Sequence, residues 1–296
     1  MKVFPQKALP VIEALTGQGI NVSHACRVLG VSRGGYYAWR GRPISKTGLR
    51  RIWLAKEIIE IHKQSRGTYG VPRVTAELRF GRGVPIGHNI VRSIMLELGL
   101  KGIPNRRPPK GTKMARITSL DLVRRNFHRP APNQLWLTDI TEHPTRVGKV
   151  YCCAVLDVFS RRVVGWSIDS TQTSTLVMNA LGMATKARHP NGELVIHSDR
   201  SSQFASWAFS QKVKEAGLAP SMGSVGPAYD NAMMKSFWGR MQVELLNRKK
   251  WKTLIDLANS IHDYIKIFHN PRRRHNALNM LSPTEYEHQH SMTTAA

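Results

Sequence analysis

The sequence is short of acidic residues, of cysteines and of long apolar runs. No stretch approaches the roughly 20 consecutive apolar residues of a membrane-spanning helix, so a membrane protein is not expected. The first residues, MKVFPQKALPVIEAL, contain no apolar segment followed by a small-residue cleavage site, which argues against secretion. Cys26, Cys152 and Cys153 are odd in number, two of them are adjacent, and no Cys/His cluster has zinc-ligand spacing. This pattern favours a reduced, cytoplasmic setting.

The scarcity of acidic residues leaves a large positive charge. Lysine and arginine number 44 against 19 aspartates and glutamates, which gives a formal net charge of +25, and the excess is spread along the whole chain. A folded protein this basic attracts polyanions, because neutralising their phosphates releases counterions. Nucleic acid is therefore the favoured partner. Ribosome association, an acidic membrane surface or simple solubility are the alternatives.

Residues 1–42 predict short helices separated by a glycine-containing turn. Ser23 is expected to cap one helix, Gly30 to end it with a positive φ, and Ser32 to cap the next. This order is typical of a DNA-binding helix-turn-helix, whose second helix lies in the major groove. Arg33, at the start of that helix, would then meet a phosphate or a base edge. A small helical hairpin with an aromatic core also fits the pattern.

A second helical block, residues 49–100, follows a predicted linker at residues 42–48. Its short helices are again separated by glycine, and they form either a second helix-turn-helix or a helical spacer. One face of its last helix is predicted to carry Ile90, Ile94, Met95 and Leu98. Arg92 lies elsewhere on that helix and is available to DNA. Residues 101–126, which begin basic and rich in proline and glycine, are predicted to be a linker that tracks a DNA backbone or is merely solvated.

Residues 127–290 contain strand-like runs. The segments QLWLTDIT, KVYCCAVLDVFS and RRVVGWSI are rich in β-branched and aromatic residues and are joined by short loops, which predicts an antiparallel meander of three strands. Strands and helices then alternate, from the helical TSTLVMNALGMATKA to the strand ELVIHSD and the long helix of YDNAMMKSFWGRMQVELLNRKK. The block is therefore predicted to be an α/β domain with a mixed sheet flanked by helices.

Two aspartates stand where strands of this block are predicted to end. Asp139 is expected at the end of the first strand and Asp199 at the end of the fourth. Acids beside loops are well placed to share a site. Paired carboxylates bind magnesium or manganese through hard oxygen ligands, and a site with two such ions performs phosphodiester chemistry. Taken alone, each aspartate also fits a capping or turn role.

Several motifs in a fixed order give these aspartates a context. The stretches WLTDIT, LDVFSRRVVGW, HSDRSSQF and AYDNAMMKSFWGRMQVELL resemble the retroviral-integrase-like core of insertion-sequence transposases. The resemblance is closest to the second-frame proteins of elements with two reading frames. It extends to SHACRVLGVSRGGYYAW, TYGVPRVTAEL and FHNPRRRHNALNMLSPTEY, so it covers nearly the whole chain.

The resemblance implies a ribonuclease H-like fold and an Asp, Asp, Glu triad that binds two magnesium or manganese ions. The first two family positions fall on Asp139 and Asp199, which would be the metal ligands. The family glutamate follows the second aspartate after 35 residues, and in this sequence that position is Lys235. The neighbouring residues Tyr229, Asp230, Asn231, Ser236, Phe237 and Trp238 match the family, so a shifted alignment does not explain the lysine.

A lysine at this position has a physical consequence. A protonated amine offers no lone pair to a metal, and it places positive charge where cations would lie. Glu244 is nine residues further on, which at about 100° per residue turns it roughly 180° away. Asp230 is five residues earlier and better placed to cap the helix. We therefore expect that the chain has lost most or all strand-transfer activity.

Other polar residues of the core are expected to have supporting roles. Asp157 is predicted to be structural, and His197 is predicted to orient or pack beside Asp199. Tyr229 and Trp238 fit the core better than a base-stacking role. A basic run, which suits phosphate contact or is simply solvated, consists of Arg272, Arg273 and Arg274, followed by His275.

The function expected from these features is metal-dependent DNA cleavage and strand transfer by a transposase. A catalytically dead derivative that occupies element ends and inhibits active copies is the alternative, and Lys235 favours it. A nuclease acting on RNA–DNA hybrids is weaker, because it leaves the helices ahead of the core unexplained. The expected partners are the terminal repeats, the target DNA and further copies of the chain, in the cytoplasm at the nucleoid.

Overall fold

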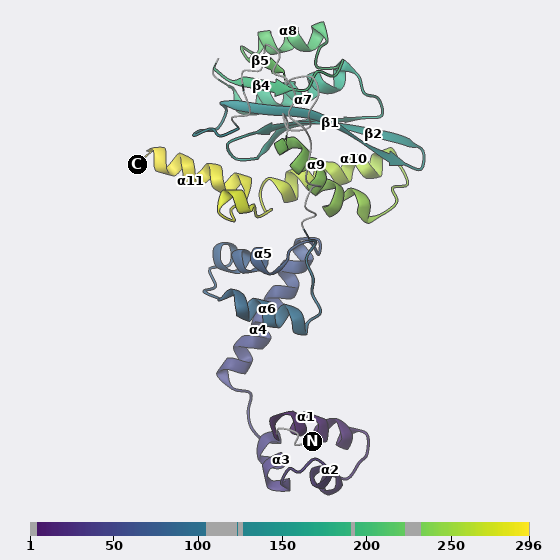
Figure 1. Ribbon diagram of the computed structural model, residues 1–296, viewed down its shortest axis with the longest axis vertical. Helices are drawn as coiled ribbons and strands as arrows, with labels where there is room; N and C mark the ends of the chain where they lie inside the picture. The colour runs from purple at the N-terminus through teal and green to yellow at the C-terminus, as the bar shows by residue number, and fades with distance from the viewer. Residues whose placement is uncertain (1–4, 105–122, 124–126, 191–192, 223–231, 296) are drawn as a thin grey trace, which may run out of the picture. The chain divides into compact units, whose positions relative to one another are not determined.

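The computed structural model describes residues 5–104, 123, 127–190, 193–222 and 232–295. The chain divides into two compact units, Met1–Lys56 and Glu57–Ala296, and most of their helices and strands are labelled in Figure 1. In the described part of the chain, no helix has both the length and the apolar character needed to cross a bilayer.

The N-terminal unit contains the helices α1 (Pro5–Gly17), α2 (Val22–Val28) and α3 (Arg33–Arg40). Two predictions for this unit are confirmed: Gly30 follows α2 with a φ of 68°, and the Oγ of Ser32 accepts the N–H of Gly35 at 3.0 Å as the cap of α3. The cap predicted for α2 is wrong. Asn21 caps that helix, because its backbone is extended and its side chain accepts the N–H of Ser23 at 2.8 Å.

A small core holds these helices together. Ile12, Cys26 and Tyr36 are buried, one from each helix, together with Ala25. The hydroxyl of Tyr36 donates a hydrogen bond to the carboxylate of Glu13, so the buried phenol keeps a polar partner. The unit is therefore a compact bundle of three short helices with one tyrosine at its centre.

The second helical region contains α4 (Lys46–Gln64), α5 (Val71–Ala76), the π-helix η1 (Glu77–Gly81) and α6 (His88–Glu97). Helix α4 begins at Lys46, so the irregular part of the predicted 42–48 linker shrinks to residues 42–45. The predicted apolar face of α6 needs a correction too. Its buried residues are Val91, Ile94 and Met95, which have i, i+3, i+4 spacing, whereas Ile90 and Leu98 are exposed.

The core domain contains a five-stranded mixed sheet in the order β3-β2-β1-β4-β5. The strands are β1 (Leu135–Thr145), β2 (Gly148–Asp157), β3 (Val163–Asp169), β4 (Val195–Ser198) and β5 (Ala219–Met222). The first three form the predicted antiparallel meander, and β4 and β5 continue the sheet in parallel with β1. The predicted mixed α/β fold is therefore confirmed.

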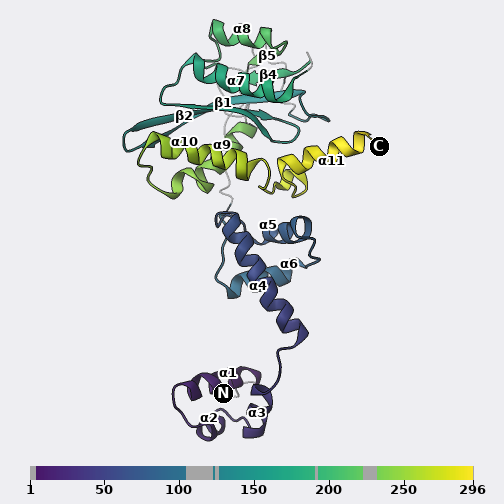
Figure 2. The ribbon, with the colours of Figure 1, turned by 180° about the vertical axis from the view of Figure 1, so that it is seen from behind.

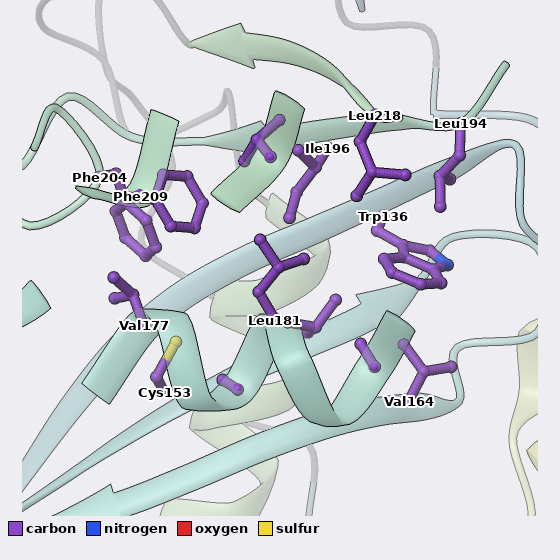
Figure 3. Close-up of a cluster of buried hydrophobic side chains, with 14 of the residues drawn as sticks. Trp136, Cys153, Val164, Val177, Leu181, Leu194, Ile196, Phe204, Phe209 and Leu218 are labelled. Atoms are coloured by element: carbon purple, nitrogen blue, oxygen red, sulfur yellow. The ribbon is translucent and has the colours of Figure 1, made fainter. Parts of the chain in front are cut away.

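Helices α7 (Ser174–Arg188) and α8 (Trp207–Glu215) cover one face of this sheet, where the main core lies (Figures 1 and 3). Trp136 of β1, Leu181 of α7 and Phe209 of α8 are buried in it. Gly165 of β3 allows α7 to approach closely, because a Cβ there would lie 2.3 Å from the carbonyl oxygen of Ala180.

The opposite face carries α9 (Ala232–Glu244) and α10 (Leu254–Asp263), as both ribbon views show (Figure 2). The short helices η2 (Leu246–Arg248), η3 (Tyr264–His269) and η4 (Asn276–Leu278) and the terminal α11 (Pro283–Ala295) complete the domain. Tyr69 joins the second helical region to this part. Its hydroxyl donates to the carbonyl of Arg272 at 3.0 Å and accepts the N–H of Arg274 at 2.8 Å.

Candidate catalytic site

The strand pairing brings Asp139 and Asp199 together. Asp139 lies inside β1, not at its end as predicted, because β1 continues to Thr145 alongside β2. Asp199 directly follows β4, as predicted. Each paired residue of β1 faces the β4 residue sixty positions later, and the same register continued past Ser198 would set Asp199 beside Asp139. Because β4 ends before Asp199 while β1 continues past Asp139, the carboxylate of Asp199 lies on a loop beside the strand that carries Asp139.

The surroundings of Asp139 favour its protonated form. Burial has the largest effect and raises the pKa of Asp139 to about 6, and the negative charge of Asp199 acts in the same direction. The N–H of Ile140, which donates to the Asp139 carboxylate at 2.9 Å, opposes this shift. Asp199 itself is exposed, and its carboxylate accepts the N–H of Ser201 at 3.0 Å. The pair thus combines one desolvated and one solvated carboxylate.

Helix α9 contributes two residues to the surroundings of Asp139. The ammonium of Lys235, in the first turn of α9, lowers the pKa of Asp139. The indole of Trp238, one turn later, lowers it as well. The Nε1–H of Trp238 is buried and donates to none of the described residues, so the indole acts on Asp139 as a nearby dipole. Trp238 was predicted to be a core residue, and its spacing of three from Lys235 was the signal that it also faces the site.

The donor set does not fit two divalent cations. Among the described residues, no three histidine, cysteine or acidic side chains gather where they could hold a metal ion. Asp139 and Asp199 supply carboxylate oxygens, but α9 adds an ammonium, which has no lone pair for a cation. The resemblance predicts a third carboxylate at position 235, and an ammonium there would repel divalent cations.

The sequence predicted that Glu244 does not substitute for a carboxylate at position 235, and its surroundings in the structure agree. It lies at the other end of α9 with 2% of its side chain exposed. Its two oxygens accept from Nε and Nη2 of Arg273 at 2.8 and 2.7 Å, and one accepts from the hydroxyl of Tyr264 at 2.9 Å. These donors hold the pKa of Glu244 below its usual value against the opposing effect of burial. Asp230 lies outside the described residues, as does Tyr229.

Asp157 and His197 have structural surroundings. Asp157 is fully buried and accepts the N–H groups of Asn133 at 2.8 Å and Phe159 at 2.9 Å, so it shapes the loops at the end of β2. His197 in β4 is buried, and its Nδ1 lies 3.0 Å from the hydroxyl of Ser221 in β5. Each residue links neighbouring parts of the sheet, which agrees with the supporting roles predicted for them.

The arginines predicted to contact DNA differ in their exposure. Arg33 on α3, Arg92 on α6 and Arg272 after η3 are exposed. Arg273 and Arg274 are buried, whereas the sequence predicted that this run contacts phosphate or is solvated. Arg273 pairs with Glu244, and Arg274 pairs with Glu77 at 2.7 Å and Glu285 at 2.6 Å. A basic run in the sequence did not reveal these acidic partners, because two of the three lie far away in the chain.

Comparison with known proteins defines the class of the fold and then the family. Residues 129–228 and 216–283 match two descriptions of the integrase core domain, and residues 48–108 match an HTH-like domain. The match places the two aspartates and α9 in an integrase-type core. Curated relatives named as transposases extend the similarity to most of the chain, and the protein belongs to the insertion-sequence transposase family.

Three of these relatives show the extent of the similarity. The transposase of IS904 from Lactococcus lactis is 33% identical over 82% of this chain and 96% of its own length. The transposase of IS629 from Shigella sonnei is 33% identical over 94% and 95%, and that of IS3A from Escherichia coli is 31% identical over 90% and 94%. The HTLV-2 integrase catalytic core, solved with magnesium, aligns over 54% of this chain and all of its own with a TM-score of 0.44 and 20% identity.

Proposed function

We propose that this chain binds the ends of an insertion sequence but no longer carries out the cation-dependent DNA cleavage and strand transfer of a transposase. The observation that carries the proposal is that α9 places Lys235 close enough to Asp139 for its positive charge to lower the pKa of that carboxyl, which the charge of Asp199 raises. A carboxylate at position 235 would attract cations, whereas the ammonium repels them, a swing of two charge units. At short range such a change is worth on the order of several kcal/mol.

DNA binding is supported by features that Lys235 leaves intact. The net charge of +25 favours a polyanion, and exposed arginines occur on separate elements, at Arg33, Arg92 and Arg272. Arg33 opens α3, the second helix of the pattern α2, turn, α3, where a helix-turn-helix contacts bases or phosphates. The terminal repeats of the element are the proposed DNA, with several copies of the chain assembling on them.

A chain that binds element ends without cutting them would compete with active copies. This inhibitory role is the second candidate function, and the same lysine favours it. It predicts that adding this chain to an active relative from the same element slows end cleavage in proportion to the fraction of ends occupied.

The test separates binding from cleavage on labelled DNA that carries the repeats flanking the gene. The natural chain should bind this DNA and leave it uncut in magnesium. Lys235→Glu should cut it, whereas Lys235→Gln, which removes the charge without supplying a ligand, should not. Lys235→Glu combined with Asp139→Asn serves as the inactive control. A natural chain that cuts as fast as Lys235→Glu would contradict the proposal, as would a Lys235→Glu chain that binds but cuts no better than the natural one.

A further inference from the structure

A cavity of about 200 Å³ opens beside α9, which lines it with Met233, Ser236, Phe237 and Arg240. We call it the arginine cavity, because four arginines from separate segments line it: Arg73, Arg161, Arg240 and Arg273. None of the lining residues that the structure describes is acidic. Positive charge therefore converges on one small space from α5, from the β2–β3 turn, from α9 and from the segment after η3.

Two of the four arginines already have an acidic partner. Arg273 forms its paired hydrogen bonds with Glu244, and Arg73 lies 3.8 Å from the same carboxylate. Arg161 and Arg240 differ from them: in the described part of the chain, neither guanidinium forms an ion pair with a carboxylate. Both are only partly exposed, so water does not fully replace a partner. The cavity thus contains two partly desolvated cations that form no ion pair, although the charge of Glu244 also acts on Arg240.

The backbone of Arg161 supports a role for its side chain. Arg161 has a φ of 60°, in the left-handed region where glycine is favoured and a residue with a Cβ is strained. Its N–H donates to the carbonyl of Asp157 at 2.8 Å, and its carbonyl accepts from Nε2 of His269 at 3.1 Å. Both interactions use backbone atoms that glycine also has. The strained turn therefore does not need an arginine, and only the side chain distinguishes the two residues.

The arginines of the cavity also disfavour one another's charged forms. Burial in the first place, and the charge of Arg273 in the second, lower the pKa of both Arg161 and Arg240. An anion in the cavity would reverse the second effect for both residues. The guanidinium groups repel one another, and an anion between them would offset this repulsion.

The size and chemistry of the cavity select the anion. A volume of about 200 Å³ lies below the roughly 300–1,000 Å³ of pockets that enclose drug-sized ligands, so the space suits one small group. Guanidinium forks match the oxygens of a phosphate through paired charge-assisted hydrogen bonds. We propose that the arginine cavity binds one phosphate group, with Arg161 and Arg240 as its cationic ligands.

The source of the phosphate is either a DNA strand or free phosphate. Helix α9 lines the cavity with Ser236 and Arg240 and carries Lys235 on another face, so one helix adjoins both the cavity and the candidate catalytic site. We therefore expect a phosphodiester of bound DNA, and only this choice of source rests on the proposed function. The phosphate site itself does not depend on whether the chain cuts DNA.

The first experiment measures thermal unfolding of the full chain in inorganic phosphate and in chloride at equal ionic strength. Phosphate should raise the melting temperature of the natural chain by mass action and should do so much less for Arg161→Gly and Arg240→Gln. Lys214→Gln, which removes an exposed charge on α8 outside the cavity, is the matched control and should keep the full response. In chloride, Arg161→Gly should melt no lower than the natural chain, because glycine relaxes the left-handed turn.

The second experiment measures DNA affinity across a series of salt concentrations. One phosphate held by two arginines predicts that Arg161→Gly, Arg240→Gln and their combination each lower the slope of log affinity against log salt by about one, with no further loss in the double variant. Lys214→Gln should change it less. If the cavity variants lose both the phosphate-induced rise in melting temperature and part of the salt dependence of DNA affinity, DNA is the source of the phosphate. A response to inorganic phosphate alone supports the site with free phosphate as its source.

Equal responses of Arg161→Gly, Arg240→Gln and Lys214→Gln in both experiments would overturn the proposal. A low melting temperature of Arg161→Gly in chloride would also count against it, because the arginine would then stabilise the turn itself. Failure of the proposed function is a different result. It appears as cleavage by the natural chain and leaves the phosphate response of the cavity variants unchanged.

Discussion

His269 is a buried histidine in the wall of the arginine cavity that is held neutral. Its Nε2–H donates to the carbonyl of Arg161 at 3.1 Å, and its Nδ1 is buried with no hydrogen-bond partner among the described residues. A proton on Nδ1 would have no acceptor. Burial first, and the charge of Arg273 next, lower the pKa of His269 to about 4. The folded state therefore favours the neutral form of the His269 ring.

This pKa predicts how stability changes with pH. The unfolded histidine has a pKa near 6.5 and takes up its proton first as the pH falls. The contribution of His269 to the free energy of unfolding is therefore complete above pH 6.5. It is lost as the pH falls from 6.5 towards 4, and the loss reaches about 3 kcal/mol. Urea unfolding at pH 7 and pH 5 should show a larger loss for the natural chain than for His269→Gln, which keeps a donor for the Arg161 carbonyl. Equal losses in the two proteins would contradict the assignment.

The buried pair of Glu244 and Arg273 makes a second prediction at this scale. Arg273→Met removes the cation and leaves a carboxylate that is 2% exposed without its main partner, which should cost about 3–5 kcal/mol. Combining it with Glu244→Gln removes the uncompensated charge, so the double variant should lose less than the sum of the single losses. Urea unfolding of the four proteins measures this coupling. Additive losses would mean that the two residues act independently.

At the scale of elements, the contact between α7 and β3 depends on the absence of one side chain. Gly165→Ala would set a methyl group 2.3 Å from the backbone oxygen of Ala180, so α7 or β3 must shift. Overpacking of this kind should cost at least about 1–3 kcal/mol in urea unfolding. Gly182→Ala, within α7 itself, is the matched control. Its Cβ would meet nothing within 4 Å, and the better helix propensity should stabilise by up to about 1 kcal/mol. Similar effects of the two substitutions would contradict this packing.

The elements also show where sequence patterns were sufficient. The meander, the strand that ends before Asp199 and the Ser32 cap follow from local composition and are found in the structure. The end of β1 was misjudged, because pairing with β2 extends the strand past Asp139. The cap of α2 was misplaced, because Asn21 and Ser23 both suit a cap and only the backbone conformation distinguishes them. Long-range pairing and backbone angles are the information that local patterns lack.

At the scale of the whole molecule, the candidate site joins residues from distant parts of the chain. The family resemblance predicts a site at positions 139, 199 and 235, and the structure places Asp199 and Lys235 close enough to Asp139 for their charges to act on its pKa. The sequence could not show that Arg273 and Arg274 are neutralised by Glu244, Glu77 and Glu285, nor that Arg161 and Arg240 meet at one cavity. Charge that looks uniform along the sequence is thus divided into paired and unpaired arginines by the fold.

The most direct test of the account is calorimetric titration of the full chain with Mn²⁺ in the absence of DNA. We predict weak binding by the natural chain and binding at least about tenfold tighter by Lys235→Glu, a gain of about 1.4 kcal/mol or more, which Asp139→Asn should remove. Lys235→Gln should fall between the two. Equal Mn²⁺ affinity of the natural chain and Lys235→Glu would contradict the claim that a lysine beside two aspartates keeps cations out.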